Sequence, residues 1–144
     1  MFLEDMSSNG VIDSIIGLFN NQRYSDIKFK VDIKHIVAHK LILKTRCDYY
    51  SSMFSENWSQ NDLNEIEVND YSYNVFYAFL KYLYTDCVDI NVEEVFDLKA
   101  LAKFYCEEKL INKCDYIIRT RIARSDYIYF DQLVETVSAQ LSGL

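Results

Sequence analysis

The residues that could do chemistry in this chain are its two histidines and four cysteines, which are His35, His39, Cys47, Cys87, Cys106 and Cys114. His35 and His39 are four residues apart, and on one helix this spacing would let both imidazoles bind a zinc ion. A zinc-protease helix also needs a glutamate directly after the first histidine, and Ile36 stands there. The residue pattern changes from strand to helix between the two histidines, so we do not expect them to share a helix face.

The cysteines form no recognisable metal or nucleophile motif. Cys106 and Cys114 are eight residues apart, which does not make a zinc knuckle, and cysteines on apolar helix faces usually serve as small buried hydrophobic residues. Cys47 lies close to His39 along the chain, but no third group that would orient the histidine and no oxyanion donor is evident. We therefore expect no enzymatic activity, no metal and no cofactor.

Length and composition predict one domain whose partners are proteins. A chain of 144 residues, half of them apolar, buries roughly two thirds of its unfolded surface around a single core. The formal net charge of -7 opposes binding to nucleic acid or anionic membranes, and the cations of residues 99–124 alternate with acidic residues as on solvated helices. The absence of a signal peptide and of a membrane-spanning stretch predicts reduced cysteines and a cytoplasmic or nuclear location.

Hydrophobic periodicity predicts that the strands lie early in the chain. An amphipathic helix is expected over residues 9–20, with an apolar stripe of Val11, Ile12, Ile15, Ile16 and Phe19. Residues 27–31 alternate between apolar and polar side chains and predict a half-buried strand, and residues 35–38 predict a second strand. Two short helices over residues 39–45 and 47–54 are then expected to lead into a polar surface loop.

The remaining residues predict mostly helices. After a short strand at residues 66–68, Asp70 or Ser72 is expected to cap a helix whose buried face is Val75, Phe76, Phe79, Leu80 and Leu83. Residues 88–90 are the last predicted strand. Asn91, followed by Glu93 and Glu94, has the pattern of a capped helix start.

Three helices are expected to finish the chain. The first covers residues 92–105. The apolar faces of the other two are Leu110, Ile111, Cys114, Ile117 and Ile118, and then Phe130, Leu133, Val134, Val137 and Leu141. Early strands and late helices indicate an α+β domain in which helices pack around a small sheet.

Four short segments at their particular separations resemble the BTB (POZ) family: Ser25-Asp26, Ala38-His39-Lys40, Ser52-Met53-Phe54 and Tyr82-Leu83-Tyr84-Thr85. The resemblance covers residues 9–118. Within the family, residues 44–47, Trp58 and residues 83–86 look most like the BTB domains attached to propeller repeats of the chromosome-condensation-regulator type, and the later helices resemble those of cullin-3 adaptors.

The resemblance implies an α+β BTB fold with a small, mainly antiparallel sheet flanked by helices. It places the BTB domain at residues 1–120 and the start of a helical extension, of the BACK or 3-box kind, at residues 121–144. It also implies that the chain is a protein-interaction module that forms dimers.

The resemblance implies where the dimer forms. In many BTB dimers the N-terminal helix packs across a twofold axis, which would bury the stripe at Val11, Ile12, Ile15, Ile16 and Phe19 against its copy. Asp26 and Lys40 match the acidic and basic positions of a charged pocket near that axis. In the alternative interpretation, Asp26 only caps the start of a strand, and Lys40 is a solvated helix residue.

The resemblance further implies a cullin-3 site in the loop after Met53-Phe54, where adaptors carry an apolar residue, any residue and then Glu. Here Trp58-Ser59-Gln60 stands at these positions, so the apolar anchor is present and the carboxylate is not. Replacing a charge-assisted hydrogen bond by a neutral one is expected to weaken binding roughly tenfold. Phe54-Ser55-Glu56 fits the same pattern in a shifted register, although we expect Phe54 in the core, and Trp58 could instead fold back onto its own domain.

Two functions remain open from the sequence. In the first, a homodimeric adaptor recruits substrates to a cullin-3 ubiquitin ligase. In the second, a stand-alone regulatory module pairs with itself or another BTB protein and recruits no ligase. The chain contains no recognisable substrate-reading repeat or zinc finger, which favours the second function.

Overall fold

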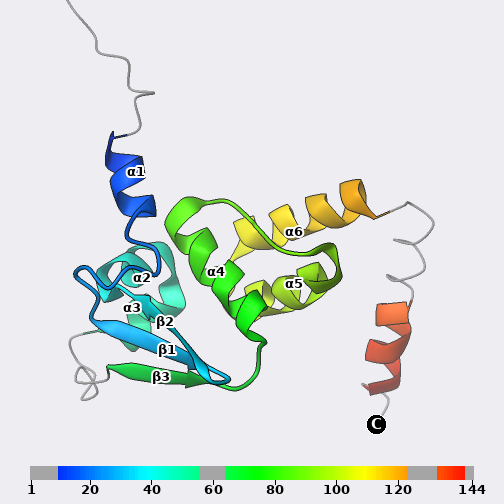
Figure 1. Cartoon of the computed structure of the whole chain (residues 1–144). Coiled ribbons are helices and arrows are strands. Elements are labelled where there is room, and N and C mark those ends of the chain that lie inside the picture. The colour runs from blue at the N-terminus through cyan, green and yellow to red at the C-terminus, as the bar shows by residue number, and fades with distance from the viewer. Residues whose placement is uncertain (1–9, 56–63, 123–132, 142–144) are drawn as a thin grey trace, which may run out of the picture.

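The computed structural model describes residues 10–55, 64–122 and 133–141. A three-stranded sheet lies at one end of the domain, and helices cover one of its faces and extend beyond it (Figure 1). This arrangement confirms the α+β class predicted from the sequence.

The sheet is formed by β1 (Ile27–Val31), β2 (Lys34–Ala38) and β3 (Glu65–Val68), in the order β2-β1-β3. β1 and β2 form an antiparallel hairpin in which Phe29 lies opposite Ile36. β3 joins the other edge of β1 and runs parallel to it, because the chain passes through two helices before it returns to the sheet. The sheet is therefore mixed rather than mainly antiparallel.

Strand alternation places one face of the sheet in the core. Ile27, Phe29 and Val31 are buried in β1, while Lys28 is exposed and Lys30 is partly exposed. On the polar face, His35 of β2 forms a hydrogen bond with Glu65 of β3, with 2.9 Å between Nε2 and Oε1. Since side chains alternate along a strand, the period of two in the sequence was sufficient to identify this half-buried strand.

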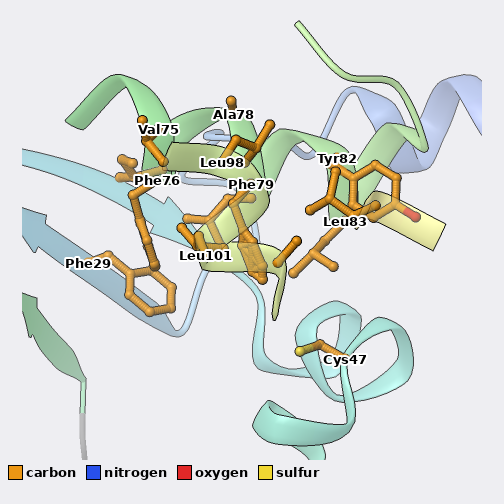
Figure 2. Packing of buried hydrophobic residues seen from close by; sticks show 14 of the residues in the cluster. Phe29, Cys47, Val75, Phe76, Ala78, Phe79, Tyr82, Leu83, Leu98 and Leu101 are labelled. Carbon is orange, nitrogen blue, oxygen red and sulfur yellow. The ribbon is translucent and has the colours of Figure 1, made fainter. Parts of the chain in front are cut away.

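Helix α4 (Tyr73–Thr85) lies at the centre of the domain. The Ser72 hydroxyl caps the helix by accepting a hydrogen bond from the backbone N–H of Val75. Ser72 is one of the two residues that the sequence predicted as the cap. The predicted buried face of the helix is confirmed in full, since Val75, Phe76, Phe79, Leu80 and Leu83 are all buried. Figure 2 shows Phe76 directed toward Phe29 of the sheet, with a ring-centroid distance of 5.1 Å.

Short helices flank α4 on both sides. The helices α2 (Lys40–Arg46) and α3 (Asp48–Met53) follow β2 and meet at the buried Cys47. On the other side, α5 (Val95–Phe104) packs Leu98 and Leu101 into the core next to α4, as Figure 2 also shows.

Helix α6 (Glu108–Arg121) packs against α5 and buries Leu110, Cys114 and Ile118. An ion pair of 2.7 Å between Lys99 and Asp115 joins α5 to α6. The expected helix near the end of the chain is present at residues 133–141, whereas Phe130 lies outside the described residues.

Two local predictions were wrong. Residues 88–90 form no strand; Val88 and Ile90 instead pack against the helical core. The apolar alternation of this segment therefore reflects half-burial and not pairing with another strand. Asn91 does not cap the next helix with its side chain. The chain enters α5 through a short 3-10 turn, η1 (Val92–Glu94), in which the Glu94 N–H bonds to the Asn91 carbonyl.

Candidate functional site

The first candidate interaction surface is a groove between the N-terminal helix, α2 and the end of α4, which we call the α1 groove. Helix α1 (Gly10–Ile16) is shorter than predicted and buries no residue. Val11, Ile12 and Leu41 are 79%, 58% and 73% exposed. The groove has a volume of about 550 Å³, and these three apolar side chains line it together with Ile15, Ile42, Thr45, Arg46, Leu83, Tyr84, Thr85 and Asp86.

The segment after α1 anchors the helix to the domain. Phe19 is half-buried and packs its ring against Tyr77 and Tyr84 of α4, with centroid distances of 4.9 and 5.5 Å. The Asn20 side chain accepts a hydrogen bond of 3.1 Å from the backbone N–H of Val37 in β2. The predicted stripe therefore divides: Phe19 fixes the helix to its own domain, and the four residues of the stripe that precede it remain exposed.

His39 forms a buried polar pair with Tyr84, which lines the α1 groove. The His39 Nε2 atom is 2.7 Å from the Arg23 carbonyl oxygen, which can only accept, so Nε2 carries the proton. In the neutral ring Nδ1 then accepts from the Tyr84 hydroxyl at 2.6 Å. The same hydroxyl accepts from the His39 backbone N–H at 2.9 Å. Burial raises the pKa of Tyr84 well above its usual value, which keeps the hydroxyl protonated as a donor.

Asp26 and Lys40, which the sequence singled out together, are neighbours in the structure. The Asp26 carboxylate accepts a hydrogen bond of 2.8 Å from the backbone N–H of Lys40, the first residue of α2. The His39 side chain makes no capping bond to this helix, so the acceptor at its N-terminus comes from the residue before β1. The Lys40 ammonium lies 5.5 Å from the centroid of the Phe54 ring.

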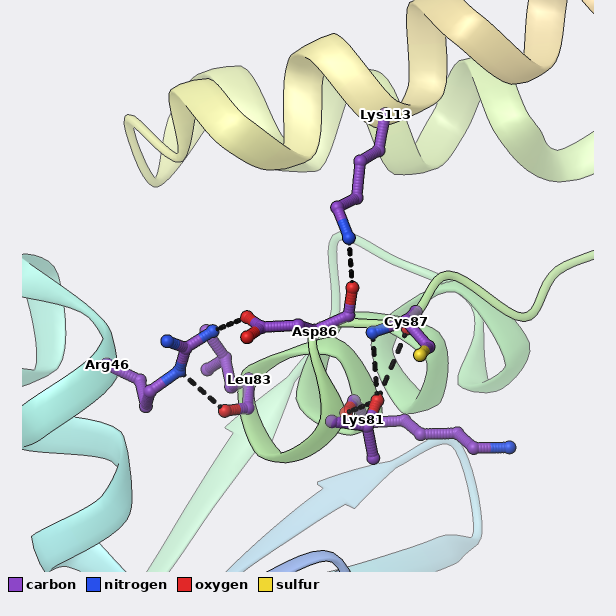
Figure 3. Close-up of polar contacts among 7 residues, drawn as sticks. Arg46, Lys81, Leu83, Asp86, Cys87 and Lys113 are labelled. Carbon is purple, nitrogen blue, oxygen red and sulfur yellow. Dashed lines mark hydrogen bonds and ion pairs between the residues drawn. The ribbon is translucent and has the colours of Figure 1, made fainter. Parts of the chain in front are cut away.

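Three helices meet at the C-terminus of α4, where Asp86 ends the helix in the left-handed conformation with φ 60°. Figure 3 shows the Asp86 carboxylate paired with Arg46 of α2 and its carbonyl bonded to Lys113 of α6. Arg46 also donates through Nε to the Leu83 carbonyl at 2.8 Å. These contacts hold one wall of the α1 groove in place.

The second surface, which we call the aromatic groove, lies between α3 and the end of α5. Its volume is about 460 Å³, and it is lined by Asp48, Tyr49, Ser52, Met53, Phe104, Tyr105 and Cys106. The Tyr49 and Tyr105 rings meet edge to face at 4.8 Å. Phe104 is 61% exposed, so this groove presents a large apolar group to solvent.

Stacked aromatic rings connect the aromatic groove to the core. Tyr50 is buried and stacks on Tyr105 and Phe54, at centroid distances of 5.6 and 5.7 Å. The hydroxyls of Tyr50 and Tyr105 are 3.4 Å apart. Burial raises the pKa of Tyr105 to about 12 and that of Tyr50 well above its usual value, so both remain neutral.

The cullin-binding residues proposed from the sequence are only partly described. Phe54 is 8% exposed and belongs to the core, as expected, so its ring is not available as an exposed anchor. Glu56, Trp58 and Gln60 lie outside the described residues.

The two histidines that suggested chemistry have structural partners instead. His35 pairs with Glu65, and His39 bonds to Tyr84. Burial raises the pKa of the Cys47 thiol to about 11, which disfavours the thiolate that a nucleophile requires. Over residues 10–55, 64–122 and 133–141, no group of three or more histidine, cysteine or acidic side chains is placed to hold a metal ion.

The sequence reasoning missed the aromatic groove and the part played by Leu41. Tyr49-Tyr50 and Phe104-Tyr105 are pairs of neighbouring aromatic residues in which one member is more buried than the other, and such pairs at a helix end could have suggested an exposed aromatic surface. That the two pairs meet depends on how α3 and α5 pack, which no local pattern encodes.

The chain is similar to known proteins over most of its length. The profile of the family described as BTB/POZ domain matches residues 15–122. Mouse Rabankyrin-5 is 30% identical over 130 residues, which cover 87% of this chain and 10% of that protein. Kelch-like protein 22 of Xenopus tropicalis is 25% identical and is matched over 77% of this chain and 18% of its own length. The chain thus spans less than a fifth of the length of these curated relatives.

Two solved structures share the fold. The BTB domain of zebrafish PATZ1 matches with a TM-score of 0.64 and 24% identity, covering 82% of this chain and 98% of that one. The BTB domain of human gigaxonin matches with a TM-score of 0.62 and 20% identity, covering 81% of this chain and 96% of that one. Because the family profile matches residues 15–122, well over half of the 144 residues, this chain belongs to the BTB/POZ domain family, whose fold serves protein interaction.

Proposed function

We propose that the protein is a homodimeric BTB adaptor that recruits substrates to a cullin-3 ubiquitin ligase. The observation that carries the dimer is the uncovered apolar lining of the α1 groove. Val11, Ile12 and Leu41 are each more than half exposed, and contiguous apolar surface of this kind marks interaction sites.

A second copy of the chain is the proposed occupant of the α1 groove. In a twofold dimer, both protomers use the same surface patch, so the apolar patch of one copy can cover the identical patch of the other. Helix α1 supplies the ridge of Val11, Ile12 and Ile15, and α2 supplies Leu41 and Ile42 beside it. Phe19 and Asn20 fix α1 in advance, which lowers the entropic cost of binding.

Replacing Ile12 by Asp is expected to dissociate the dimer, because the carboxylate would be buried without a partner charge. Sedimentation equilibrium should show the dissociation constant rising by at least about a hundredfold, as a change of about 2.7 kcal/mol implies. The matched control is Ser14→Asp, a change on the same helix away from the α1 groove. A wild-type chain that sediments only at 17.0 kDa at micromolar concentration would refute the dimer.

The aromatic groove supports the proposed cullin-3 contact. It lies directly beside α3, the helix that leads toward the predicted loop containing Trp58 and Gln60. An exposed Phe104 next to Tyr49 offers the aromatic surface that is enriched at interface hot spots. The proposed complex therefore uses the loop for an anchor and the aromatic groove for a second apolar contact.

Phe104→Ser is expected to weaken binding of a cullin-3 N-terminal fragment by about thirtyfold or more in calorimetric titration, because a hot-spot truncation costs upwards of about 2 kcal/mol. Lys103→Ser is the control, since Lys103 is also exposed on α5 but does not line the aromatic groove. Gln60→Glu should restore the charge-assisted bond and tighten binding by roughly tenfold. If neither the wild type nor Gln60→Glu binds, the adaptor function is excluded.

The second candidate function is a regulatory module that pairs with itself or another BTB protein without recruiting a ligase. Gln60 favours it, because this position lacks the carboxylate that adaptors carry. This second function predicts that the chain forms a dimer that depends on Ile12. It also predicts that neither the wild type nor Gln60→Glu binds cullin-3. The sedimentation and titration experiments therefore separate the two functions.

A further inference from the structure

The helix at residues 133–141 exposes an apolar stripe. Leu133, Val134, Val137 and Leu141 are 46%, 51%, 47% and 67% exposed. Val134, Val137 and Leu141 follow one another at spacings of three and four and so lie on one face. An isolated helix of nine residues is marginal in water, because helices this short take most of their stability from tertiary packing. The stripe therefore requires a surface that covers it.

Helix α6 carries an uncovered groove, which we call the α6 groove. It is lined by Val88, Asn112, Lys113, Tyr116 and Ile117 and has a volume of about 400 Å³. Tyr116, one of the lining residues, is 64% exposed. The extended segment that contains Val88 forms one side of the groove and α6 forms the other.

We propose that residues 133–141 fold back antiparallel to α6 and place their apolar stripe in the α6 groove of the same chain. Helices that follow each other in the chain commonly pack as antiparallel pairs. Eleven residues, 122–132, lie between the two helices and can span up to about 36 Å. The 14 residues of α6 extend over only about 21 Å, so the connection is long enough for this return.

Charge distinguishes the α6 groove from the aromatic groove as the docking site. Lys113 lines the α6 groove, and Arg121 stands two turns further along α6. Glu135, in the first turn of the C-terminal helix, would come to lie beside the last turn of α6 in an antiparallel pair. The aromatic groove is instead bordered by Asp48, which would repel Glu135. This docking makes residues 133–141 part of the BTB unit and leaves the aromatic groove open.

Hydrogen exchange measured by mass spectrometry tests the proposal on the full chain. In the wild type, amides of residues 133–141 should exchange at least about tenfold more slowly than in Val137→Asp, because local opening governs exchange. Ala139→Asp is the matched control, since residue 139 lies about 200° around the helix from Val137, and it should keep the wild-type rate.

A change in the groove itself excludes the explanation that Val137→Asp only unwinds its own helix. Tyr116→Ser should release residues 133–141 to the same degree, whereas Lys109→Ser, at an exposed position of the same helix outside the α6 groove, should not. Unprotected exchange of residues 133–141 in the wild type would overturn the proposal. Protection that increases with protein concentration would also overturn it, because the helix would then dock on a second copy.

Discussion

At the scale of single residues, the pairing of His39 with Tyr84 couples three parts of the domain. The imidazole bonds to the Arg23 carbonyl in the segment after α1, the backbone of His39 lies between β2 and α2, and Tyr84 belongs to α4. Both polar side chains are buried, at 5% exposure or less. A buried polar group that loses its partner retains its full desolvation cost, so the Tyr84 hydroxyl is central to this contact.

Tyr84→Phe is therefore expected to lower the free energy of unfolding by about 1 to 3 kcal/mol, because it leaves Nδ1 and the backbone N–H of His39 without their shared partner. Urea denaturation measures the change. Tyr77→Phe is the control, because Tyr77 lies on the same helix and is partly exposed. Within the described part of the chain, the Tyr77 hydroxyl forms no hydrogen bond. Equal losses in the two variants would contradict the role given to the His39 pair.

At the scale of elements, α2 depends on a residue outside the helix for its N-terminal cap. Asp26 reaches from the segment before β1 to the Lys40 N–H, so the sheet and the helix are joined at this point. The contact agrees with a capping role for Asp26. The charged pocket that the resemblance places at the same two residues stays a prediction.

Two substitutions separate these roles of Asp26. Asp26→Ala removes the cap and should lower stability by about 0.5 to 2 kcal/mol, whereas Asp26→Asn keeps an acceptor oxygen and should cost much less. If the charge serves the dimer, Asp26→Asn should weaken dimerisation in sedimentation experiments while the unfolding free energy stays close to that of the wild type. Equal stability loss in both variants would show that the charge, rather than the cap, stabilises the fold.

At the scale of the whole molecule, an acidic chain presents an apolar surface to its proposed copy. Each chain carries a formal charge of -7, so two copies repel one another at long range while the α1 groove favours their contact. Across the described ranges, no helix is long and apolar enough to cross a membrane.

Salt should therefore strengthen the proposed dimer. Raising the ionic strength from about 0.01 M to about 0.15 M shortens the Debye length from about 30 Å to about 8 Å, which screens the repulsion between the two net charges. Sedimentation at the two ionic strengths should show a severalfold lower dissociation constant at the higher one. A dissociation constant that rises with salt would instead indicate that ion pairs, and not the apolar stripe, hold the copies together.

Local patterns were enough to identify most of the elements. A period of two identified β1, and a period of 3.6 identified the buried face of α4, because burial of one face leaves its spacing in the sequence. The same rule gave a false strand at residues 88–90, since alternation reports half-burial and does not report whether a neighbouring strand is available for pairing.

The sequence by itself determined the fold class, the family resemblance and the apolar stripe of α1, because each depends on the order of residues along the chain. Only the tertiary structure decided that Phe19 packs inward on Tyr77 while Val11 and Ile12 remain exposed. It also brought Tyr49 and Phe104 together in the aromatic groove. These surfaces form between helices that are distant in sequence, so their geometry is set by packing, which no local spacing of residues records.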